Sequence, residues 1–327
     1  MNYKQMKLAF LCLSLLLPLT AFAQTEVQWI TTASGVRARA GAEASAAEVT
    51  RLPIGTVLRQ LDQEQRAATI GGKQDFWYHV ALPQEKDGWV FGAFLKRFDA
   101  ARKDAIYREI AATKAKAETG TFAEFSDLAR FLSSVSAGIT DRSAQAEVEL
   151  WRWISVHRAL ENIPMEKLQQ PEYQRFIKAM QPQITYSDPA GAWFIQADVL
   201  WNLQKKYADT PIAETIAWEA AQLPLPGECE GDLGCGLDYT LSTEGRYLQL
   251  YPNGKHSDAA LTNLLEGFQD VKGAFEMDKG MGGTESPSAK AERRKLIAKL
   301  RATYARTTNP KKAKIDANLM KLEALYR

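Results

Sequence analysis

The stretch FWYHVALPQEKDGWVFGAFL, residues 76–95, decides the fold of the first part of the chain. Residues 76–82 are almost wholly aromatic or apolar and stop at Pro83. Asp87-Gly88 is a turn signal, and a second apolar run follows at residues 89–91. Two short apolar runs on either side of a turn predict a pair of antiparallel β-strands.

The same alternation of short strands and turns extends over residues 27–97. Gly41, Pro53-Ile54-Gly55 and Gly71-Gly72 divide this stretch into short apolar runs. Several short strands within about 70 residues, each bounded by a turn, are typical of a small closed sheet. We therefore predict a small β-barrel over residues 27–97.

Four segments of this region resemble, in order, the motifs of bacterial SH3-like (SH3b) domains. They are GVRARAG (35–41), similar to N-V-R-x-G-P; VTRLPIGTVL (49–58), similar to V-I-x-x-L-x-x-G-x-x-V; WYHV (77–80), similar to W-Y-K-V; and GWVFGAFL (88–95), similar to G-W-V-x-x-x-Y-L. The first segment departs from the family at Arg39 and Ala40, and no Pro follows Gly41. The resemblance implies an SH3-like β-barrel of a cell-envelope protein and a role in binding cell-wall peptides.

Four residues are the candidate ligand-binding side chains of this barrel: Trp77, Trp89, Arg37 and His79. Alternation along a strand places Tyr78, Val80 and Leu82 on one face and Trp77 and His79 on the other. If the first set fills the interior, Trp77 faces outward, either as a platform for a ligand or covered by the neighbouring domain. Trp89 would then form an aromatic wall, and Arg37 would pair with a carboxylate.

Beyond residue 98 the composition changes to helix formers, and residues 98–270 are predicted to form an all-α domain without strands. Thr121 and Glu124 form a capping-box pattern ahead of an apolar helical stripe. A later helix is expected to begin at Pro189 and to bury Trp193, Ala197, Leu200 and Trp201.

One part of this region, around residues 239–268, has the look of a helical repeat. The segment YLQLYPNGKHSDAALTNL (247–264) resembles the helix–turn–helix junction of tetratricopeptide-like (TPR-like) envelope proteins. Pro252 would end one helix, and Ser257 or Asp258 would cap the next. Because no period of about 34 residues is found, we predict a single helical hairpin here.

The last part of the chain is strongly basic. Residues 271–288 are rich in Gly and are predicted to be a flexible linker, followed by a basic helical hairpin at 289–327. Residues 288–327 hold 12 Lys and Arg against three acids, whereas residues 24–287 hold 27 against 36. The net charge is therefore +9 for residues 288–327 and −9 for residues 24–287, which we call the acidic body. The basic tail is either a solvated surface, or it contacts anionic envelope components, an acidic partner or the acidic body.

The first 23 residues have the pattern of a cleavable secretory signal. Lys4 and Lys7 precede an apolar run at residues 8–22, and Ala21-Phe22-Ala23 is a cleavage pattern. The run is short for a membrane anchor, which needs about 20 apolar residues. We predict a secreted or periplasmic protein, cleaved after Ala23, with no transmembrane segment afterwards.

Removal of the first 23 residues leaves two cysteines, Cys229 and Cys235. A close pair outside the cytoplasm predicts a disulfide. Two metal-binding interpretations stay open: Ca²⁺ held by acidic residues of 228–238, and Zn²⁺ held by both cysteines with His256. No cofactor is predicted.

The sequence favours binding over catalysis. It contains no H-E-x-x-H, G-x-S-x-G or phosphate-loop pattern and no nucleic-acid-binding motif. Two non-enzymatic functions are compatible with it. In the first, the barrel binds envelope material such as peptidoglycan peptides. In the second, the helical domain is a periplasmic scaffold for protein–protein interaction.

Overall fold

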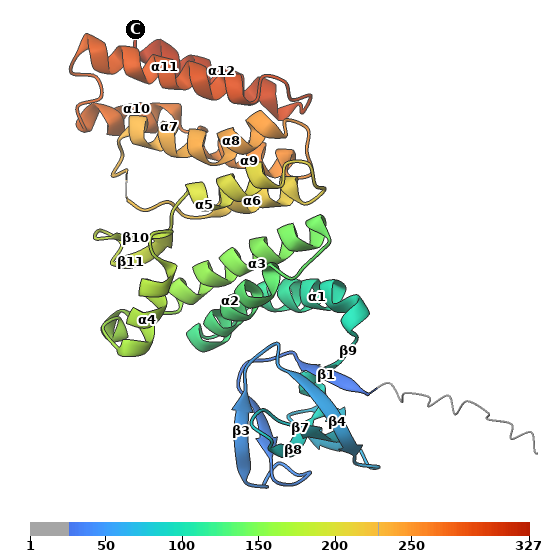
Figure 1. Ribbon diagram of the computed structural model, residues 1–327. Helices are drawn as coiled ribbons and strands as arrows, with labels where there is room; N and C mark the ends of the chain where they lie inside the picture. Colours follow the sequence, from blue (N-terminus) through green and yellow to red (C-terminus); the bar gives the residue numbers. More distant parts are fainter. Residues whose placement is uncertain (1–25, 228) are drawn as a thin grey trace, which may run out of the picture.

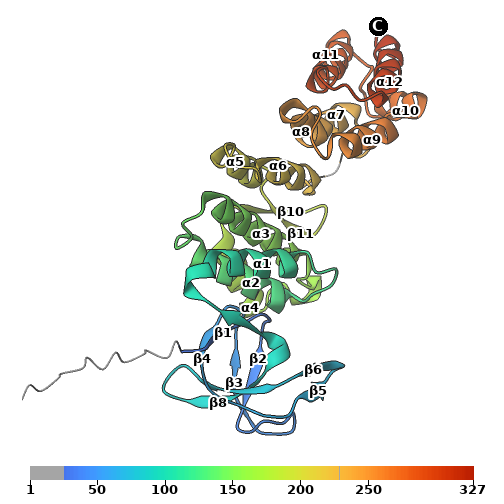
Figure 2. The same cartoon turned by 90° about the vertical axis from the view of Figure 1, so that its right-hand side faces the viewer.

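The computed structural model describes residues 26–227 and 229–327, so the signal predicted at 1–23 lies outside the described residues. An antiparallel β-sheet region is followed along the chain by a mainly helical region (Figure 1). The helices lie in successive layers, with the sheet at one end of the stack. Helices α11 (Pro287–Thr303) and α12 (Lys311–Leu325) lie at the other end (Figures 1 and 2).

Seven strands form one antiparallel sheet in the order β3-β2-β8-β7-β4-β1-β9, and β5 and β6 form a separate hairpin. In the described part of the chain the end strands β3 and β9 do not pair, so backbone hydrogen bonds do not close the predicted barrel. The antiparallel strands predicted from the sequence are confirmed. Their bounds are β1 Gln28–Thr31, β2 Val36–Arg39, β3 Glu48–Leu52, β4 Val57–Gln63, β5 Ala68–Ile70, β6 Lys73–Asp75, β7 Trp77–Ala81, β8 Asp87–Phe91 and β9 Leu95–Phe98.

The sheet region has a small core of its own. Tyr78, Val80 and Leu82 belong to it, as their alternation predicts. Trp29 packs at its edge, with ring centroids 4.4 Å from Tyr78 and its indole N–H donated to Gln60 Oε1 at 2.9 Å. The other buried members are Val36, Ala38, Leu52, Leu58 and Val90.

The sheet and the first helices share a second core. Ile30 and Ile54 are buried in the same cluster as the apolar residues of the helices. Next to Ile54 in the chain, Gly55 packs its backbone against the ring of Phe131. The Pro53-Ile54-Gly55 turn is therefore one of the contacts between the sheet and the helical region, along with the stacking of Phe98 on Tyr107.

The helices agree with the predicted caps and apolar stripes. The capping box of Thr121 and Glu124 is present at the start of α2, and Phe125, Leu128, Phe131 and Leu132 are buried. The helix bounds, apart from those already given, are α1 Lys103–Ala115, α2 Phe122–Ser136, α3 Arg142–Glu161, α4 Pro171–Met180, α5 Asp198–Lys206, α6 Ala213–Gln222, α7 Leu233–Ser242, α8 Glu244–Leu250, α9 Ser257–Gly267 and α10 Val271–Gly280; short 3-10 turns lie at Gly92–Phe94, Ala100–Arg102 and Met165–Lys167.

The prediction of an all-α domain is wrong between α4 and α5. Strands β10 (Ile184–Ser187) and β11 (Ala192–Ile195) form an antiparallel hairpin there. Pro189 lies in its turn and not at a helix start, and Gly191 has φ +59°. Turn residues flanked by aromatic and β-branched residues favour this hairpin over a helix.

The helical hairpin predicted around residues 239–268 is confirmed as α8 and α9. Its capping differs from the prediction, because His256 occupies the N-cap position without a side-chain bond. Ser257 instead donates its hydroxyl to the Gly254 carbonyl at 2.8 Å.

The flexible linker predicted at 271–288 is also wrong in its first half, where α10 forms. Asp270 caps this helix at the Gly273 N–H, and Phe275 packs against Tyr326 with ring centroids 5.1 Å apart. The hairpin of α11 and α12 buries a seam of apolar side chains: Leu296, Leu300, Tyr304, Leu319 and Leu322. Leu325, at the end of α12, is 41% exposed.

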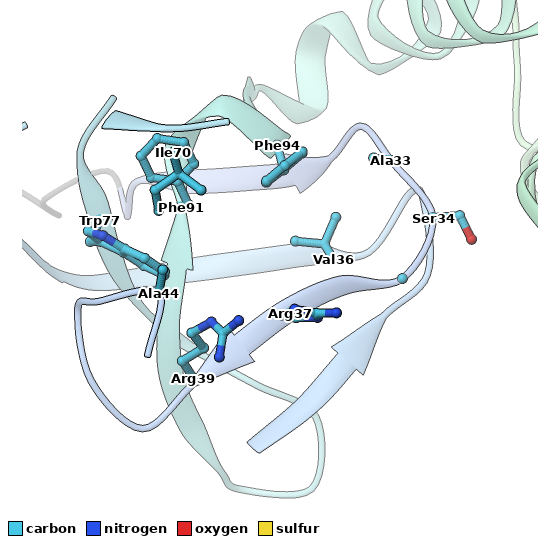
Figure 3. A pocket seen from close by; sticks show the side chains of 11 residues that line it. Ala33, Ser34, Val36, Arg37, Arg39, Ala44, Ile70, Trp77, Phe91 and Phe94 are labelled. Atoms are coloured by element: carbon cyan, nitrogen blue, oxygen red, sulfur yellow. The ribbon is translucent and has the colours of Figure 1, made fainter. Parts of the chain in front are cut away.

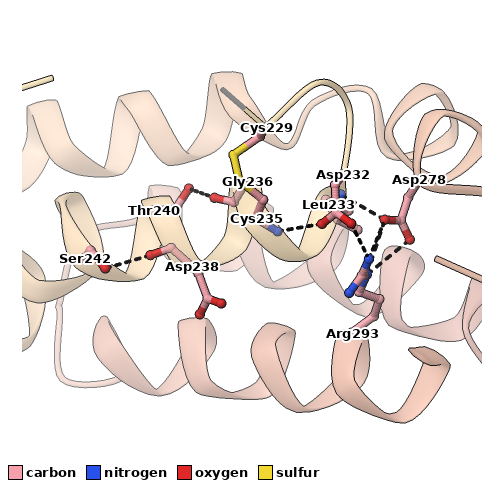
Figure 4. Close-up of a disulfide and its surroundings, with 10 residues drawn as sticks. All are labelled: Cys229, Asp232, Leu233, Cys235, Gly236, Asp238, Thr240, Ser242, Asp278 and Arg293. Carbon is pink, nitrogen blue, oxygen red and sulfur yellow. Dashed lines mark hydrogen bonds and ion pairs between the residues drawn. A yellow bond between two sulfur atoms is a disulfide. The ribbon is translucent and has the colours of Figure 1, made fainter. Parts of the chain in front are cut away.

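Cys229 and Cys235 form a disulfide, as predicted, with a Cα–Cα distance of 5.4 Å (Figure 4). It ties the segment before α7 to the first turn of that helix, where Asp232 is the N-cap. Among the helices of residues 26–227 and 229–327, none combines the length and the apolar character that a membrane-spanning segment needs.

We expect the variant with Cys229→Ser and Cys235→Ser to lose about 2–3 kcal/mol of unfolding free energy. The bond closes a short loop, and its loss frees that loop in the unfolded chain. Urea unfolding of the variant and the parent measures the difference. Thiol counting on exported protein checks the bond itself, and two free thiols would contradict it.

Candidate ligand-binding site

The outer face of the sheet carries two rows of side chains. Strand register places Arg39 beside Trp89 and Trp89 beside His79, which makes the first row. Phe91 pairs with Trp77 in the second row. Because residues two apart on a strand share a face, Arg37 belongs to the second row.

A cavity of about 270 Å³ lies over this face (Figure 3). Arg37 and Arg39 border one side of it, and Phe91 and Phe94 lie across from them (Figure 3). Its lining consists of Ala33, Ser34, Gly35, Val36, Arg37, Arg39, Ala44, Ile70, Trp77, Phe91 and Phe94. Apart from the two arginines and Ser34, the side chains in this list are apolar or aromatic.

Trp77 forms a wall of this cavity. The residue is only 3% exposed, and its ring centroid lies 5.5 Å from that of Phe91. Ala44 and Ile70, from the loop before β3 and from β5, line the same cavity. Trp77 is therefore not a free platform, and the residues that line the cavity with it all belong to the sheet region. Its indole N–H is buried without a hydrogen-bond partner in the described part of the chain.

The two arginines give the cavity its charge. Arg37 Nε lies 3.4 Å from Glu48 Oε2, with its side chain 54% exposed, and Arg39 Nη1 donates to the Ala46 carbonyl at 2.6 Å. Glu48 also accepts a hydrogen bond from Arg51, which lowers its pKa, and the charges of Arg37 and Arg39 lower it further. One carboxylate thus faces three guanidinium groups, and a positive charge remains over the cavity.

Trp89 and His79 lie beside the cavity and do not line it. Their rings stack with centroids 4.9 Å apart, and His79 Nε2 is 3.1 Å from Asp87 Oδ1. The structure thus brings Trp77 and Arg37 together and leaves Trp89 and His79 one row away. Arg39 and Phe91 were missed, although their two-residue spacing from Arg37 and Trp89 would have placed them on this face.

A second hollow lies on the helical region, between α2 and α4. Its volume is about 530 Å³, and Phe122, Phe176, Arg130 and Arg175 are among its walls. Among the described residues, no group of three or more His, Cys, Asp or Glu side chains is placed to hold a metal ion.

The comparisons with known proteins add no family. No family model matches the chain, and neither a curated protein nor a solved structure matches it.

Proposed function

We propose that the chain is an exported, non-enzymatic envelope protein whose SH3-like sheet region binds short peptides with free carboxylates, such as those of peptidoglycan. The cavity that joins Arg37 and Arg39 to Trp77 and Phe91 carries this proposal. A guanidinium group forms two parallel hydrogen bonds to a carboxylate, and aromatic walls bind the aliphatic part of a peptide.

Three further observations support the proposal. The four SH3b-like segments supply β2, β3, β7 and β8, and three of these strands, β2, β7 and β8, carry the two rows of the outer face. The disulfide at Cys229 and Cys235 is compatible with an oxidising compartment, as export requires. The cavity is small and takes the end of a peptide rather than a folded surface.

The binding test replaces Arg37 with Gln. We expect Arg37→Gln to weaken binding of the full chain to purified sacculi at least fivefold, because a hydrogen bond to a charged group contributes about 1.5–3 kcal/mol. A sedimentation assay with sacculi measures the bound fraction. The matched control is Arg51→Gln, since Arg51 pairs with the same Glu48 but does not line the cavity.

Equal loss in both variants would show binding through general charge, and no loss in Arg37→Gln would remove this site. Trp77→Ala is a poorer test, because deleting a buried Trp costs about 3–5 kcal/mol of stability and affects folding as well. The folded fraction of each variant is checked by circular dichroism before binding is compared.

The alternative function is a periplasmic protein–protein scaffold that acts through the helical region. The hollow between α2 and α4 favours it, because its lining combines apolar side chains such as Phe122 and Phe176 with the charged residues Asp127, Arg130, Glu172 and Arg175. Capture of an envelope protein that is lost in Arg175→Glu and kept in Arg37→Gln would assign binding to this hollow.

A further inference from the structure

The last two helices leave one side uncovered. α11 and α12 lie side by side at the end of the stack, above the layer of α7 to α10 (Figures 1 and 2). Their exposed positions recur at helical spacing on both helices. We call this set the outer face of α11 and α12: Ala291, Glu292, Lys295, Ala298, Lys299, Ala302, Ala313, Lys314, Met320, Lys321, Ala324 and Leu325.

The outer face is positively charged because internal pairs use the nearby acids. Asp316 and Glu323 both pair with Arg301, at 3.4 and 3.6 Å. Lys295 lies 3.6 Å from Glu292, the one acid in the set. In the part of the chain that the structure describes, Lys299, Lys314 and Lys321 have no ion pair.

Two large apolar side chains project among these lysines. Met320 is 50% exposed and Leu325 is 41% exposed. The other uncharged positions of the face are alanines, whose side chains are much shorter than those of the lysines. Cations on flexible stems around exposed apolar side chains suit the headgroup layer of a bilayer, where the stems pack on apolar groups and the charges stay in water.

We propose that the outer face of α11 and α12 binds the headgroups of anionic lipids at a membrane surface. Charge complementarity favours anionic lipid over a second copy of the same face. Each copy carries four lysines and one acid there, so two such faces repel each other. The proposal does not depend on the cavity in the sheet region, which lies at the opposite end of the stack (Figure 1).

The test is flotation of the full chain with vesicles of phosphatidylcholine alone and of phosphatidylcholine mixed with phosphatidylglycerol. We expect binding to the mixed vesicles only. Replacing Lys295, Lys299, Lys314 and Lys321 with Gln should reduce the partition coefficient at least tenfold, since each cation near an anionic surface is worth about fivefold. Binding should also fade between about 0.1 and 1 M salt, as the screening length falls from about 10 to 3 Å.

The matched control replaces four exposed lysines elsewhere, Lys86, Lys167, Lys178 and Lys205, with Gln. It changes the net charge by the same amount and should keep binding within about twofold of the parent. Met320→Ser with Leu325→Ser should weaken binding while leaving the salt dependence in place. Arg37→Gln should bind vesicles as the parent does, which separates this test from that of the cavity.

Three results would overturn the proposal. One is equal binding to both kinds of vesicle, and another is equal loss in the two lysine variants. The third is self-association of the parent in sedimentation without lipid, abolished by the outer-face variant, together with no flotation. That result would assign the lysines to the acidic body of a second copy.

Discussion

Asp278→Ala is expected to lower the free energy of unfolding by about 3–5 kcal/mol, because it leaves a largely buried arginine without its main partner. The Asp278 side chain is 0% exposed and that of Arg293 is 13% exposed. Arg293 Nη2 donates to Asp278 Oδ1 at 3.0 Å. The Tyr326 hydroxyl and the Leu233 N–H donate to the same carboxylate at 2.8 and 2.9 Å. Helices α7, α10 and α11 therefore meet at one charge (Figure 4), and Tyr326 reaches the same carboxylate from the end of α12.

The control is Asp238→Ala, an exposed aspartate on α7 outside this network (Figure 4). We expect its free energy of unfolding to stay within about 0.5 kcal/mol of the parent. Urea unfolding of the full chain measures both variants. Equal stability of Asp278→Ala and Asp238→Ala would show that the network contributes nothing.

The pH dependence adds a second readout for Asp278. Burial opposes its ionisation, but hydrogen bonds from Arg293, Tyr326 and the Leu233 N–H outweigh burial and lower its pKa. A carboxyl group whose pKa is lower in the folded state contributes its full stabilisation at pH values above its pKa in the unfolded chain, about 3.9. The contribution is lost as pH falls through the lower folded pKa. The difference between parent and Asp278→Ala should therefore shrink in acid.

The strands could be predicted because their signals are local. Tyr78, Val80 and Leu82 alternate with Trp77 and His79. The turn signal at Asp87-Gly88 is a few residues late, because the turn lies at residues 83–86 and Gly88 belongs to β8. Alternation decides which side chains enter the core of a half-buried strand, whatever it pairs with. The same holds for the capping box of Thr121, whose two bonds lie within four residues.

Helix α10 and the β10–β11 hairpin could not be predicted in the same way. The Gly-rich sequence around α10 has weak helix propensity, and contacts such as Phe275 with Tyr326 stabilise the helix from about fifty residues away. At β10–β11 one Pro fits both a first helical turn and a hairpin turn. The strand pairing of Tyr186 with Trp193 decides between them.

The candidate site was predicted in part. Trp77 and Arg37 were named from motif and alternation, and both line the cavity. Trp89 and His79 lie on the same face of the sheet as Trp77 and Arg37. The cavity forms at the other row, where Ala44 from the loop before β3 and Ile70 from β5 line it. Loop positions depend on long-range packing, which strand periodicity does not report.

Gly55→Ala is expected to lower the free energy of unfolding by about 2–5 kcal/mol, from backbone strain and overpacking together. Gly55 has φ +83°, in the left-handed region, where a Cβ is strained. A Cβ built there would lie 2.0 Å from Phe131 Cδ2. The Phe131 ring cannot move freely, because it is buried and packs edge-on against Tyr107 at 5.5 Å. The added methyl group should push the sheet away from α2.

Two variants separate the causes of the Gly55→Ala effect. Gly72→Ala has the strain without the clash, since Gly72 has φ +76° and nothing within 4 Å of a built Cβ, and we expect it to cost about 1–2 kcal/mol. Phe131→Leu makes room at the contact. The free energies of unfolding of Gly55→Ala, Phe131→Leu and the double variant form a cycle. A double variant more stable than the sum of the single effects predicts, by about 0.5–3 kcal/mol, would locate the cost at this contact. Strict additivity would show that the turn and α2 are not coupled.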